Sequence, residues 1–454
     1  MDPDFDVFVI GAGQAGSPLA KSLAEKGRRV ALAERSDIGG SCVNFGCTPT
    51  KAAFASTRIA HLARRGAQYG LRIPTIDVDY AAVVGRARDM AVDFRNHLAA
   101  ELAKVGNLTM LAQHVRLEGR DGDLFRLRAG SRSICARRVV LDTGTRSVIP
   151  PIEGLDQAGC VHAGNWLDLA DLPARLVVIG GGYIGLEMAQ FYRRLGSEVT
   201  VLEGGGRVAG HEDEDVAAAL QKLLEAEGIR FRLHTRVEKV EGKRGALTIT
   251  AGDARLEATH MFVATGRRPN TDDLGLETVG VKTSKHGIVE VDEKLATSVA
   301  GIWAAGDIRG GPMFTHTAWD DYRILESQIA GDGSRTTERI VPYAVFTDPE
   351  LGRVGMTESE ARKAGHRVKI GRFAMKANGK AIEVGETAGF IKVVIDADDD
   401  RLLGAAVLAT EGAELVHVYV ALMNARAPFA AIRDAVFIHP TLAEAVQSAV
   451  SEIG

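Results

Sequence analysis

The stretch "FDVFVIGAGQAGSPLAKSLAEKGRRVALAE", residues 5–34, decides the fold of this chain. It reads as an apolar strand, a glycine-rich turn, a helix that stops at Gly27, a second apolar strand and a terminal acid, Glu34. This order is that of half a dinucleotide-binding fold. A GxGxxG turn alone is a weak signal, but here the strand–helix–strand context surrounds it.

The same pattern returns later in the chain. "RLVVIGGGYIGLEMAQFYRRLGSEVTVLE", residues 175–203, matches the first copy in register at an offset of 169 residues. The identical positions are Gly11, Gly13, Gly16, Ala20, Gly27, Val30 and Glu34, which become Gly180, Gly182, Gly185, Ala189, Gly196, Val199 and Glu203. An internal repeat of this length predicts two dinucleotide sites in one α/β chain.

Each copy carries the same chemistry. The first glycine permits a tight turn, the second lets the backbone approach a pyrophosphate, and the third lets helix and strand pack closely. The pyrophosphate then meets free N–H groups at the start of the helix. Glu34 and Glu203 each follow the third glycine by 18 residues, where a carboxylate accepts hydrogen bonds from a ribose 2′-hydroxyl. Because Glu203 would repel a 2′-phosphate, we expect NAD(H) in preference to NADP(H), although Arg207 lies nearby.

Two further stretches set the domain boundaries. "VVLDTGTRSVIP" (139–150) and "MFVATGRRPN" (261–270) are strands that run into a TG turn and then a proline, as paired hinges would. We therefore predict one dinucleotide domain from 1–150 and 271–340, a second from 151–270, and a C-terminal α+β dimerisation domain from 341–454. "GIWAAGDIRGG", from residue 301, ends a strand on Asp307, which suits a carboxylate that binds a polyol.

Composition excludes several classes of partner. The 454 residues are 46% hydrophobic and 25% charged, with a formal charge of −4, so we expect no nucleic acid or anionic membrane as partner. The acidic start "MDPDFD" is unlike a secretory signal, and no long apolar run would span a bilayer. We expect a cytoplasmic protein. Four cysteines in so long a chain do not make a disulfide scaffold.

Two of the cysteines lie in "GGSCVNFGCTPTK", residues 39–51. The CxxxxC spacing lacks the further ligands of a zinc site, and an iron–sulfur site of plant-like spacing would need another cysteine where Pro49 and Thr50 stand. A redox pair is therefore favoured. On a regular helix, five residues would separate the cysteines by about 7.5 Å along the axis, beyond disulfide reach. We expect the turn to be distorted at Gly46 and Pro49.

At this point the chain resembles the class I flavoprotein disulfide reductases, the family of dihydrolipoamide dehydrogenase, glutathione reductase and mercuric reductase. The cysteine segment, both glycine motifs, the TG hinges, "AAGD" (304–307) and "HPTLAEA" (439–445) occur in the family's order. The resemblance implies FAD at the first site, a nicotinamide nucleotide at the second, a redox-active Cys42–Cys47 disulfide between them, and a homodimer whose active site is shared between subunits.

The resemblance also assigns residues. It implies that Cys47 lies against the flavin, that Cys42 attacks the acceptor, that Lys51 pairs with Glu187 near the flavin, and that His439 with Glu444 is the acid–base pair supplied by the partner subunit. For the FAD site we expect Gly11, Gly13, Gly16, Glu34, Gly39, Gly40, Ser41, Lys51, Gly144, Asp307 and His316. For the NAD site we expect Gly180, Gly182, Tyr183, Gly185, Glu203 and Gly266, with Tyr183 as a lid over the nicotinamide. We expect no metal ligands.

The function implied is an FAD-dependent NAD(P)H:disulfide oxidoreductase, similar to dihydrolipoamide dehydrogenase, with a small-molecule or lipoyl-type disulfide as acceptor. No cysteine follows Cys160, which disfavours relatives with a C-terminal redox pair. However, Asp348 in "FTDPELG" stands where lipoamide enzymes usually carry histidine, and Ala443 replaces a serine. The alternative is an NAD(P)H-dependent metal-ion (mercuric or copper), quinone or oxidant-response reductase. A non-catalytic flavin-binding scaffold is a third possibility.

Overall fold

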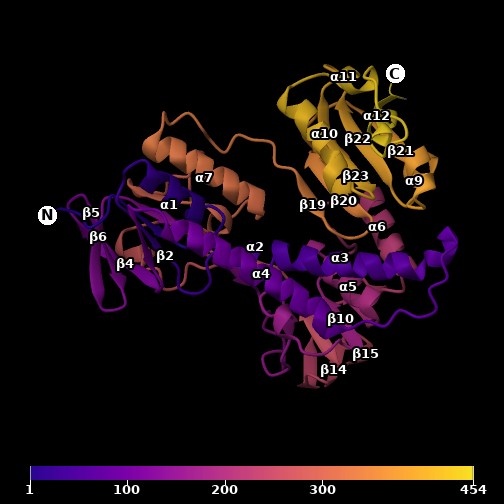
Figure 1. Ribbon diagram of the computed structural model, residues 1–454, viewed down its shortest axis with the longest axis horizontal. Coiled ribbons are helices and arrows are strands. Elements are labelled where there is room, and N and C mark those ends of the chain that lie inside the picture. Colours follow the sequence, from indigo (N-terminus) through magenta and orange to yellow (C-terminus); the bar gives the residue numbers. More distant parts are fainter. Residues whose placement is uncertain (1, 452, 454) are drawn as a thin grey trace.

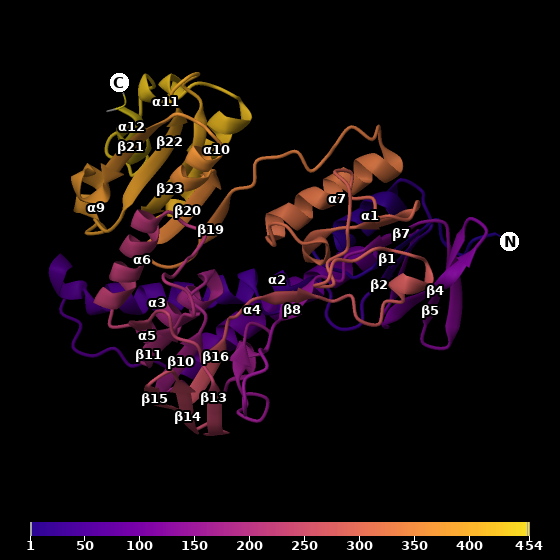
Figure 2. The same cartoon turned by 180° about the vertical axis from the view of Figure 1, so that it is seen from behind.

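The computed structural model describes residues 2–451 and 453. Three five-stranded sheets, each with its own helices, make up most of the mixed α/β chain. Figure 1 and Figure 2 show the N-terminal sheet and the C-terminal sheet on opposite sides of the molecule, with the second sheet below them. A long pair of helices runs between these parts.

The first sheet is parallel, with the strand order β18-β7-β1-β2-β3. Its strands are β1 (Val7–Ile10), β2 (Val30–Ala33), β3 (Leu108–Leu111), β7 (Val139–Leu141) and β18 (Ile302–Ala304). Alternate residues of β1 pack on opposite faces, as the period of two requires. Val7 and Val9 pack with α1 (Gly16–Glu25) and α7 (Thr315–Ala330), while Phe8 and Ile10 join the core beneath a small antiparallel sheet. That sheet is β4 (Val115–Asp121), β5 (Leu124–Ala129) and β6 (Arg132–Ala136).

The second sheet repeats this plan, in the order β12-β11-β10-β16-β9. Its strands are β9 (Val161–His162), β10 (Arg175–Ile179), β11 (Glu198–Leu202), β12 (Arg230–Arg232) and β16 (His260–Val263). Leu176 and Val178 of β10 pack with α5 (Tyr183–Leu195) and α6 (Glu214–Ala226), and Val177 and Ile179 face another small antiparallel sheet. Its strands are β13 (Lys239–Lys243), β14 (Ala246–Ala251) and β15 (Ala254–Ala258). The repeat seen in the sequence is thus a repeat of three layers.

The two TG stretches are joined in space. β8 (Thr145–Ser147) pairs antiparallel with β17 (Arg267–Pro269), so the chain leaves for the second sheet and returns from it through two adjacent strands.

The cysteine segment opens the long helical pair. It forms α2 (Gly40–Asn44) and the start of α3 (Cys47–Arg64), and α4 (Tyr80–Ala103) returns along α3. Helix α3 also packs on α5 of the second domain, and Ala53 and Phe191 belong to one buried cluster. The cysteines therefore lie close to where the helices of the first and the second sheet meet. Short 3-10 turns are η1 (Gly66–Tyr69), η2 (Trp166–Asp168), η3 (Leu276–Thr278), η4 (Gly306–Arg309) and η5 (Met375–Ala377).

The C-terminal sheet is antiparallel, with the order β19-β20-β23-β22-β21. Its strands are β19 (Tyr343–Val345), β20 (Glu350–Gly355), β21 (Val368–Ala374), β22 (Phe390–Asp396) and β23 (Leu402–Ala409). Helix α10 (Gly412–Asn424) contacts β20 and β23, and α12 (Glu444–Ser451) contacts β21 and β22. The remaining helices are α8 (Glu358–Lys363), α9 (Gly379–Glu383) and α11 (Ala430–Arg433).

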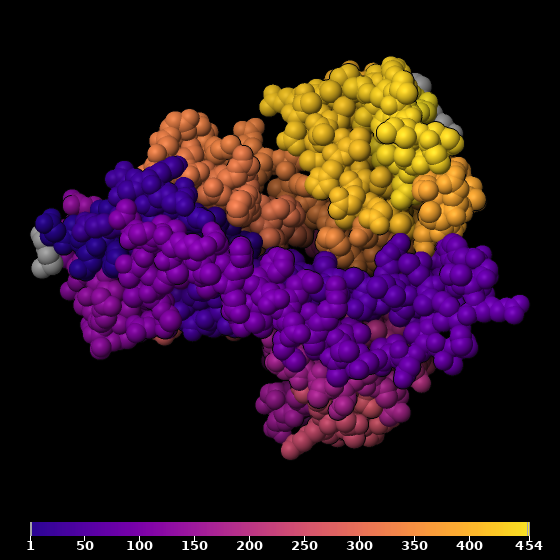
Figure 3. All heavy atoms as spheres, viewed as in Figure 1, coloured from indigo at the N-terminus to yellow at the C-terminus, as the bar shows by residue number. Residues whose placement is uncertain are grey.

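The surface of this domain has two features that bear on function. Figure 3 shows a hollow between the orange segment that holds α7 and the yellow C-terminal domain. Val436 and Ile438 are 99% and 79% exposed in the single chain, an unusual position for apolar side chains.

Among the helices of residues 2–451, none is both long and apolar enough to cross a membrane.

Candidate active site

The two glycine turns are shaped alike. Gly11 and Gly180 have φ of +105° and +106°, and a Cβ there would lie 2.2 Å from the Asp142 carbonyl oxygen and 2.4 Å from that of Ala264. A Cβ on Gly16 or Gly185 would lie 2.1 or 2.0 Å from the carbonyl oxygen of the first glycine of its own turn. Only glycine fits these positions. Both turns therefore present bare backbone at a helix start, which fits a dinucleotide pyrophosphate.

The two terminal acids are held in the same way. Glu34 accepts hydrogen bonds from the Ala12 N–H at 3.0 Å and the Ser36 N–H at 2.9 Å. Glu203 accepts the equivalent bonds, from the Gly181 N–H at 2.7 Å and the Gly205 N–H at 2.6 Å. Each carboxylate thus stands fixed at the end of the second strand of its copy, β2 or β11, beside the turn.

One cavity of about 1820 Å³ joins the two turns. A site for one small ligand usually measures about 300–1,000 Å³, so this cavity has room for more than one. Most of the residues expected at the site line it: Gly11, Gly13, Glu34, Gly39, Gly40, Ser41, Cys42, Cys47, Lys51, Gly144, Gly182, Tyr183, Glu187, Gly266, Asp307 and His316. Gly16, Gly180, Gly185 and Glu203 are not part of the lining. Gly180 lies in its turn, Gly16 and Gly185 lie in the first turn of α1 and α5, and Glu203 follows β11.

The cysteine pair stands at a break between two helices. Cys42 lies in α2, which ends at Asn44, and Cys47 is the first residue of α3. The chain turns sharply at Gly46, whose N–H donates to the Ser41 carbonyl at 2.6 Å and whose Cβ would lie 2.7 Å from that oxygen. The expected distortion at Gly46 is confirmed. The expectation for Pro49 is wrong, because Pro49 lies in the first turn of α3, where a missing N–H costs nothing.

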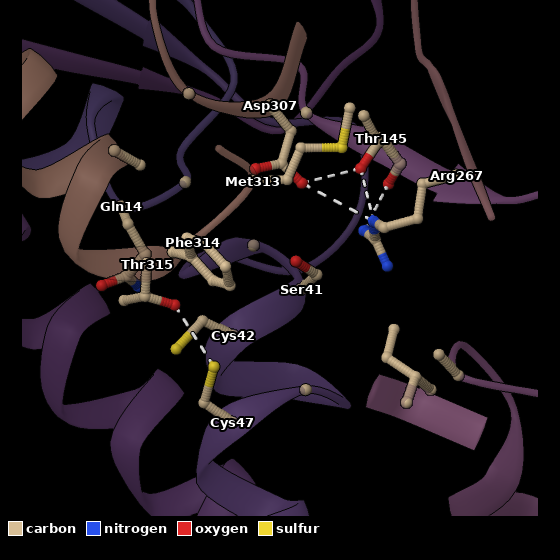
Figure 4. A pocket seen from close by; sticks show the side chains of 18 of the residues that line it. Gln14, Ser41, Cys42, Cys47, Thr145, Arg267, Asp307, Met313, Phe314 and Thr315 are labelled. Carbon is tan, nitrogen blue, oxygen red and sulfur yellow. Dashed lines mark hydrogen bonds and ion pairs between the residues drawn. The ribbon is translucent and has the colours of Figure 1, made fainter. Parts of the chain in front are cut away.

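The environment separates the two thiols chemically. A hydrogen bond from Cys42 lowers the pKa of Cys47 to about 6, and Thr315 and Lys51 add to the effect. The same hydrogen bond, together with burial, raises the pKa of Cys42. The Thr315 hydroxyl lies 3.2 Å from the Cys47 sulfur, as Figure 4 shows. The reduced pair therefore carries its single negative charge on Cys47 and keeps a proton on Cys42.

Lys51 and Glu187 meet as the resemblance implies. Lys51 Nζ of α3 lies 3.0 Å from Glu187 Oε2 of α5, and the other carboxylate oxygen accepts the Phe346 N–H at 2.8 Å. The ammonium group also lies 4.3 Å from the centre of the Phe346 ring. This contact ties the first domain, the second domain and the C-terminal domain together next to the cysteines.

The side of the cavity where FAD is expected is built around Asp307. Its carboxylate accepts a hydrogen bond from the Thr145 hydroxyl at 2.7 Å and lies 3.6 Å from Arg267 Nε, as Figure 4 shows. Thr145 and Arg267 come from the paired strands β8 and β17, each of which follows a glycine with positive φ, Gly144 or Gly266. His316, at the start of α7, has its Nε2 2.7 Å from the Pro342 carbonyl oxygen.

A polar and aromatic cluster behind Tyr183 was not predicted. The hydroxyls of Tyr183 and Tyr343 both donate to Glu212 Oε1 at 2.7 Å, and their rings stack with centroids 5.5 Å apart. Arg353 Nε lies 2.8 Å from Glu212 Oε2, and both side chains are buried. These residues come from the second and the C-terminal domain, so no local pattern in the sequence reveals them. Thr315 could have been found, since it precedes His316 directly.

His439 and Glu444 form the expected pair, but not at this cavity. His439 Nδ1 lies 3.0 Å from Glu444 Oε1, and Glu444 Oε2 accepts the Thr441 N–H at 2.8 Å. The His439 side chain is 76% exposed and lies near the exposed Val436 and Ile438. Its own chain therefore leaves this imidazole free to meet another surface. Nowhere in residues 2–451 do three or more His, Cys, Asp or Glu side chains gather as a metal site.

Comparisons with known proteins agree with this geometry. The family model "Pyridine nucleotide-disulphide oxidoreductase" matches residues 5–321, and the dimerisation domain of the same family matches 341–450. The probable pyridine nucleotide-disulfide oxidoreductase RclA of Escherichia coli is 32% identical over 98% of this chain and 99% of its own length. A dihydrolipoyl dehydrogenase of Cupriavidus necator is also 32% identical, over 99% of this chain and 98% of its own.

Solved structures extend the likeness to the whole fold. A Cu(II) complex of the HOCl-induced flavoprotein disulfide reductase RclA from Escherichia coli superposes with a TM-score of 0.90 at 32% identity. It covers 99% of this chain and 100% of that one. LpdA from Mycobacterium tuberculosis also has a TM-score of 0.90, at 25% identity, with 98% and 99% of the two chains covered.

Proposed function

The chain belongs to the pyridine nucleotide-disulphide oxidoreductase family, and from this premise we propose that it reduces a disulfide acceptor with NADH through FAD and the Cys42–Cys47 pair. The family makes it a flavoprotein disulfide oxidoreductase that uses FAD and a pyridine nucleotide, and its dimerisation domain supports a homodimer. Which nucleotide, which acceptor and which residues act are our proposals.

The first glycine turn with Glu34, Asp307 and Thr145 would hold FAD, and the second turn with Glu203 would hold the nicotinamide nucleotide. When bound, FAD supplies the exchange of an electron pair between the nicotinamide and the cysteine pair. Tyr183 would cover the nicotinamide, since it begins the helix after the second turn and lines the cavity beside Glu187. Lys51, held by Glu187, would place a positive charge at the flavin.

The chemistry of the reduced pair follows from its two pKa shifts. Cys47 holds the thiolate and Cys42 the proton, so Cys42 needs a base before it can attack. We assign this role to the partner's His439, oriented by Glu444 of that subunit, because an imidazole can both accept and donate a proton. The Cys42 thiolate then forms a bond to one sulfur of the acceptor disulfide, and the other sulfur leaves and takes the proton from the imidazole.

The pair returns to the disulfide in the next step. The Cys47 thiolate attacks Cys42 in the mixed disulfide, the Cys42–Cys47 bond forms, and the second acceptor sulfur departs as a thiolate, which takes its proton from solvent. Two electrons have then passed from the cysteine pair to the acceptor. The observation that carries the proposal is the position of Cys47, which faces the cavity beside the Thr315 hydroxyl with a pKa lowered to about 6.

The assignment of the two cysteines can be tested by absorbance. Anaerobic two-electron reduction should give the wild type a long-wavelength band from thiolate to oxidised flavin. C42S has no disulfide to reduce, so it should show the band already without reductant, and C47S should show it neither before nor after reduction. If C47S keeps the band and C42S loses it, the roles are reversed. If neither variant alters it, the proposed redox pair is wrong.

The preference for NADH rests on Glu203. Because its carboxylate is fixed by two backbone N–H groups, it cannot swing away from a 2′-phosphate without losing both bonds. We expect kcat/KM of the wild type to be higher with NADH than with NADPH. In E203A the ratio of these two values should fall, mainly because kcat/KM with NADH decreases. A wild type that favours NADPH would contradict the assignment.

A second candidate acceptor is an oxidant-linked substrate, a metal ion or a quinone. The likeness to RclA favours it, since the solved relative is described as HOCl-induced and as a Cu(II) complex. NADH-dependent assays with lipoamide, glutathione disulfide, Cu(II), Hg(II) and a quinone separate the two functions. A disulfide leaves a thiolate that needs a proton, so H439A should abolish its turnover. A metal ion or quinone leaves no such thiolate, so activity with these acceptors alone, largely kept in H439A, would replace the disulfide proposal.

We also propose a cytoplasmic location. The chain has only four cysteines in 454 residues, which is unlike the disulfide-rich composition of many secreted proteins and favours a reducing compartment.

A further inference from the structure

Asp142 marks a chemical difference between the two copies of the dinucleotide fold. It follows β7 directly, and its carbonyl oxygen faces Gly11; in the second copy Ala264 follows β16, and its carbonyl oxygen faces Gly180. The backbone therefore plays the same part in both copies. The second copy forms its turn with a methyl group at this position, so the carboxyl group of Asp142 is not required by the fold.

The carboxyl group lies directly beneath the first glycine turn. Its Oδ2 accepts the N–H of Gly16, the first residue of α1, at 2.7 Å. The same oxygen lies 2.8 Å from where a Cβ of Gly13 would stand, and Oδ1 lies 2.8 Å from that of Gly306. Asp142 is only 7% exposed, yet it lines the cavity. It thus occupies the space between the turn and the end of β18.

The charged groups around Asp142 do not balance a negative charge on it. Asp307 on η4 and Asp321 on α7 face it, and both are acids. Arg309 lies 2.7 Å from Asp321 and Arg339 lies 2.6 Å from it, so these guanidinium groups are already used. Burial raises the pKa of Asp142 well above its ordinary value, and the two acids add to this, against the hydrogen bond from the Gly16 N–H.

A dinucleotide places its pyrophosphate at this turn, against the N–H groups at the start of α1. An ionised carboxylate beneath the same turn would repel the phosphates in a buried, weakly screened setting, whereas a neutral carboxyl group would not. We propose that Asp142 is a further positioning residue of the FAD site, whose carboxyl group carries a proton while FAD is bound, so that FAD is released more readily as the pH rises.

The sign of the effect follows from linkage. Phosphates beside Asp142 favour its neutral form, so the bound protein holds the proton to a higher pH than the free protein does. Below both pKa values the retention of FAD does not depend on this group. Between the pKa of Asp142 in the free protein and its pKa in the FAD-bound protein, the dissociation constant of FAD rises by about tenfold each time the pH rises by one. In this range one proton is released with each FAD. This rests on FAD at the first site and is independent of the acceptor.

The test compares three holoproteins: the wild type, D142N and D142A. Each is diluted to nanomolar concentration at several values between about pH 5.5 and about pH 9, and the freed FAD is measured by its fluorescence. We expect the wild type to lose at least about fivefold more FAD at the alkaline end than at the acid end. D142N keeps the shape without the charge, and D142A copies Ala264, so both should hold FAD almost independently of pH.

Controls separate this effect from general loss of structure. Asp253→Asn removes an exposed acid in the turn between β14 and β15 and should leave the wild-type pH profile unchanged. Far-UV circular dichroism at each pH shows whether the fold is intact. A D142N profile equal to that of the wild type, or weaker FAD retention by D142N throughout, would overturn the proposal.

The wild type alone gives an independent answer if the variants do not fold. FAD released in weakly buffered solution at alkaline pH, with a pH indicator present, should be accompanied by up to one proton per FAD, after correction for free FAD itself. Release without any proton across the whole pH range would also overturn the proposal.

Discussion

At the scale of single residues, Thr315 helps the cysteine pair to give up its first proton. Its hydroxyl lies 3.2 Å from the Cys47 sulfur, and it contributes, after Cys42, to lowering the pKa of Cys47 to about 6. The thiolate is therefore present above about pH 6 and disappears as the pH falls through that value. No feature of the local sequence other than its place before His316 marks this threonine.

We expect T315V to raise the pKa of Cys47, because it removes a hydrogen-bond donor while nearly keeping the side-chain shape. If the hydrogen bond contributes about 1.4 kcal/mol, its loss should raise the pKa of Cys47 by roughly one. The measurement is the long-wavelength absorbance of the reduced enzyme as a function of pH. Thr48→Val, next to Cys47 along the chain, is the matched control and should not move the midpoint. Equal midpoints for T315V and the wild type would show that the hydroxyl does not stabilise the thiolate.

At the scale of elements, a cluster of charged side chains connects α3, α5 and the segment between β19 and β20. Asp348, in the connection between β19 and β20, lies 2.6 Å from Arg58 of α3 and 2.6 Å from Arg194 of α5. Arg194 is almost fully buried and also lies 2.7 Å from Glu227. Asp348 does not line the cavity. The departure from the lipoamide pattern at this position is thus explained by packing between domains, and it says little about the acceptor.

We expect D348A to destabilise the protein by about 3 kcal/mol, because it leaves the buried Arg194 and the half-buried Arg58 without their shared partner. Thermal unfolding of the holoprotein, followed by circular dichroism, measures the effect. Asp156→Ala, at an exposed position, controls for the loss of any one acid. A melting temperature lowered no further in D348A than in D156A would mean that the cluster contributes nothing net.

At the scale of the whole molecule, sequence patterns were sufficient wherever function depends on local backbone. The glycine turns, Glu34, Glu203 and the cysteine segment each lie within a short stretch whose geometry its own residues impose. Contacts between domains could not be read in this way: the Glu212–Arg353 pair joins residues 141 positions apart, through folding that no periodicity encodes. The placing of Pro49 failed for a local reason, since the first turn of a helix tolerates proline.

A shared site in a homodimer is expected because His439 lies outside the cavity of its own chain. His439 and Glu444 are paired, yet the imidazole is exposed and lies outside the cavity of its own chain, beside the exposed Val436 and Ile438. Apolar side chains with such exposure are expected to be covered by a partner. In a twofold dimer each subunit would contribute His439 to the cysteines of the other. A site of this kind can be rebuilt from two inactive chains.

We therefore expect complementation between C42S and H439A, each inactive alone with a disulfide acceptor. A mixed dimer has one site with both changes and one site with neither, because the intact Cys42 of one chain meets the intact His439 of the other. Random re-association of equal amounts should restore about a quarter of the wild-type activity, since half of the dimers are mixed and each has one working site. Mixing C42S with C47S is the control, because every site then lacks a cysteine. No gain over the separate variants, with mixed dimers shown to form, would place both groups in one chain and contradict the shared site.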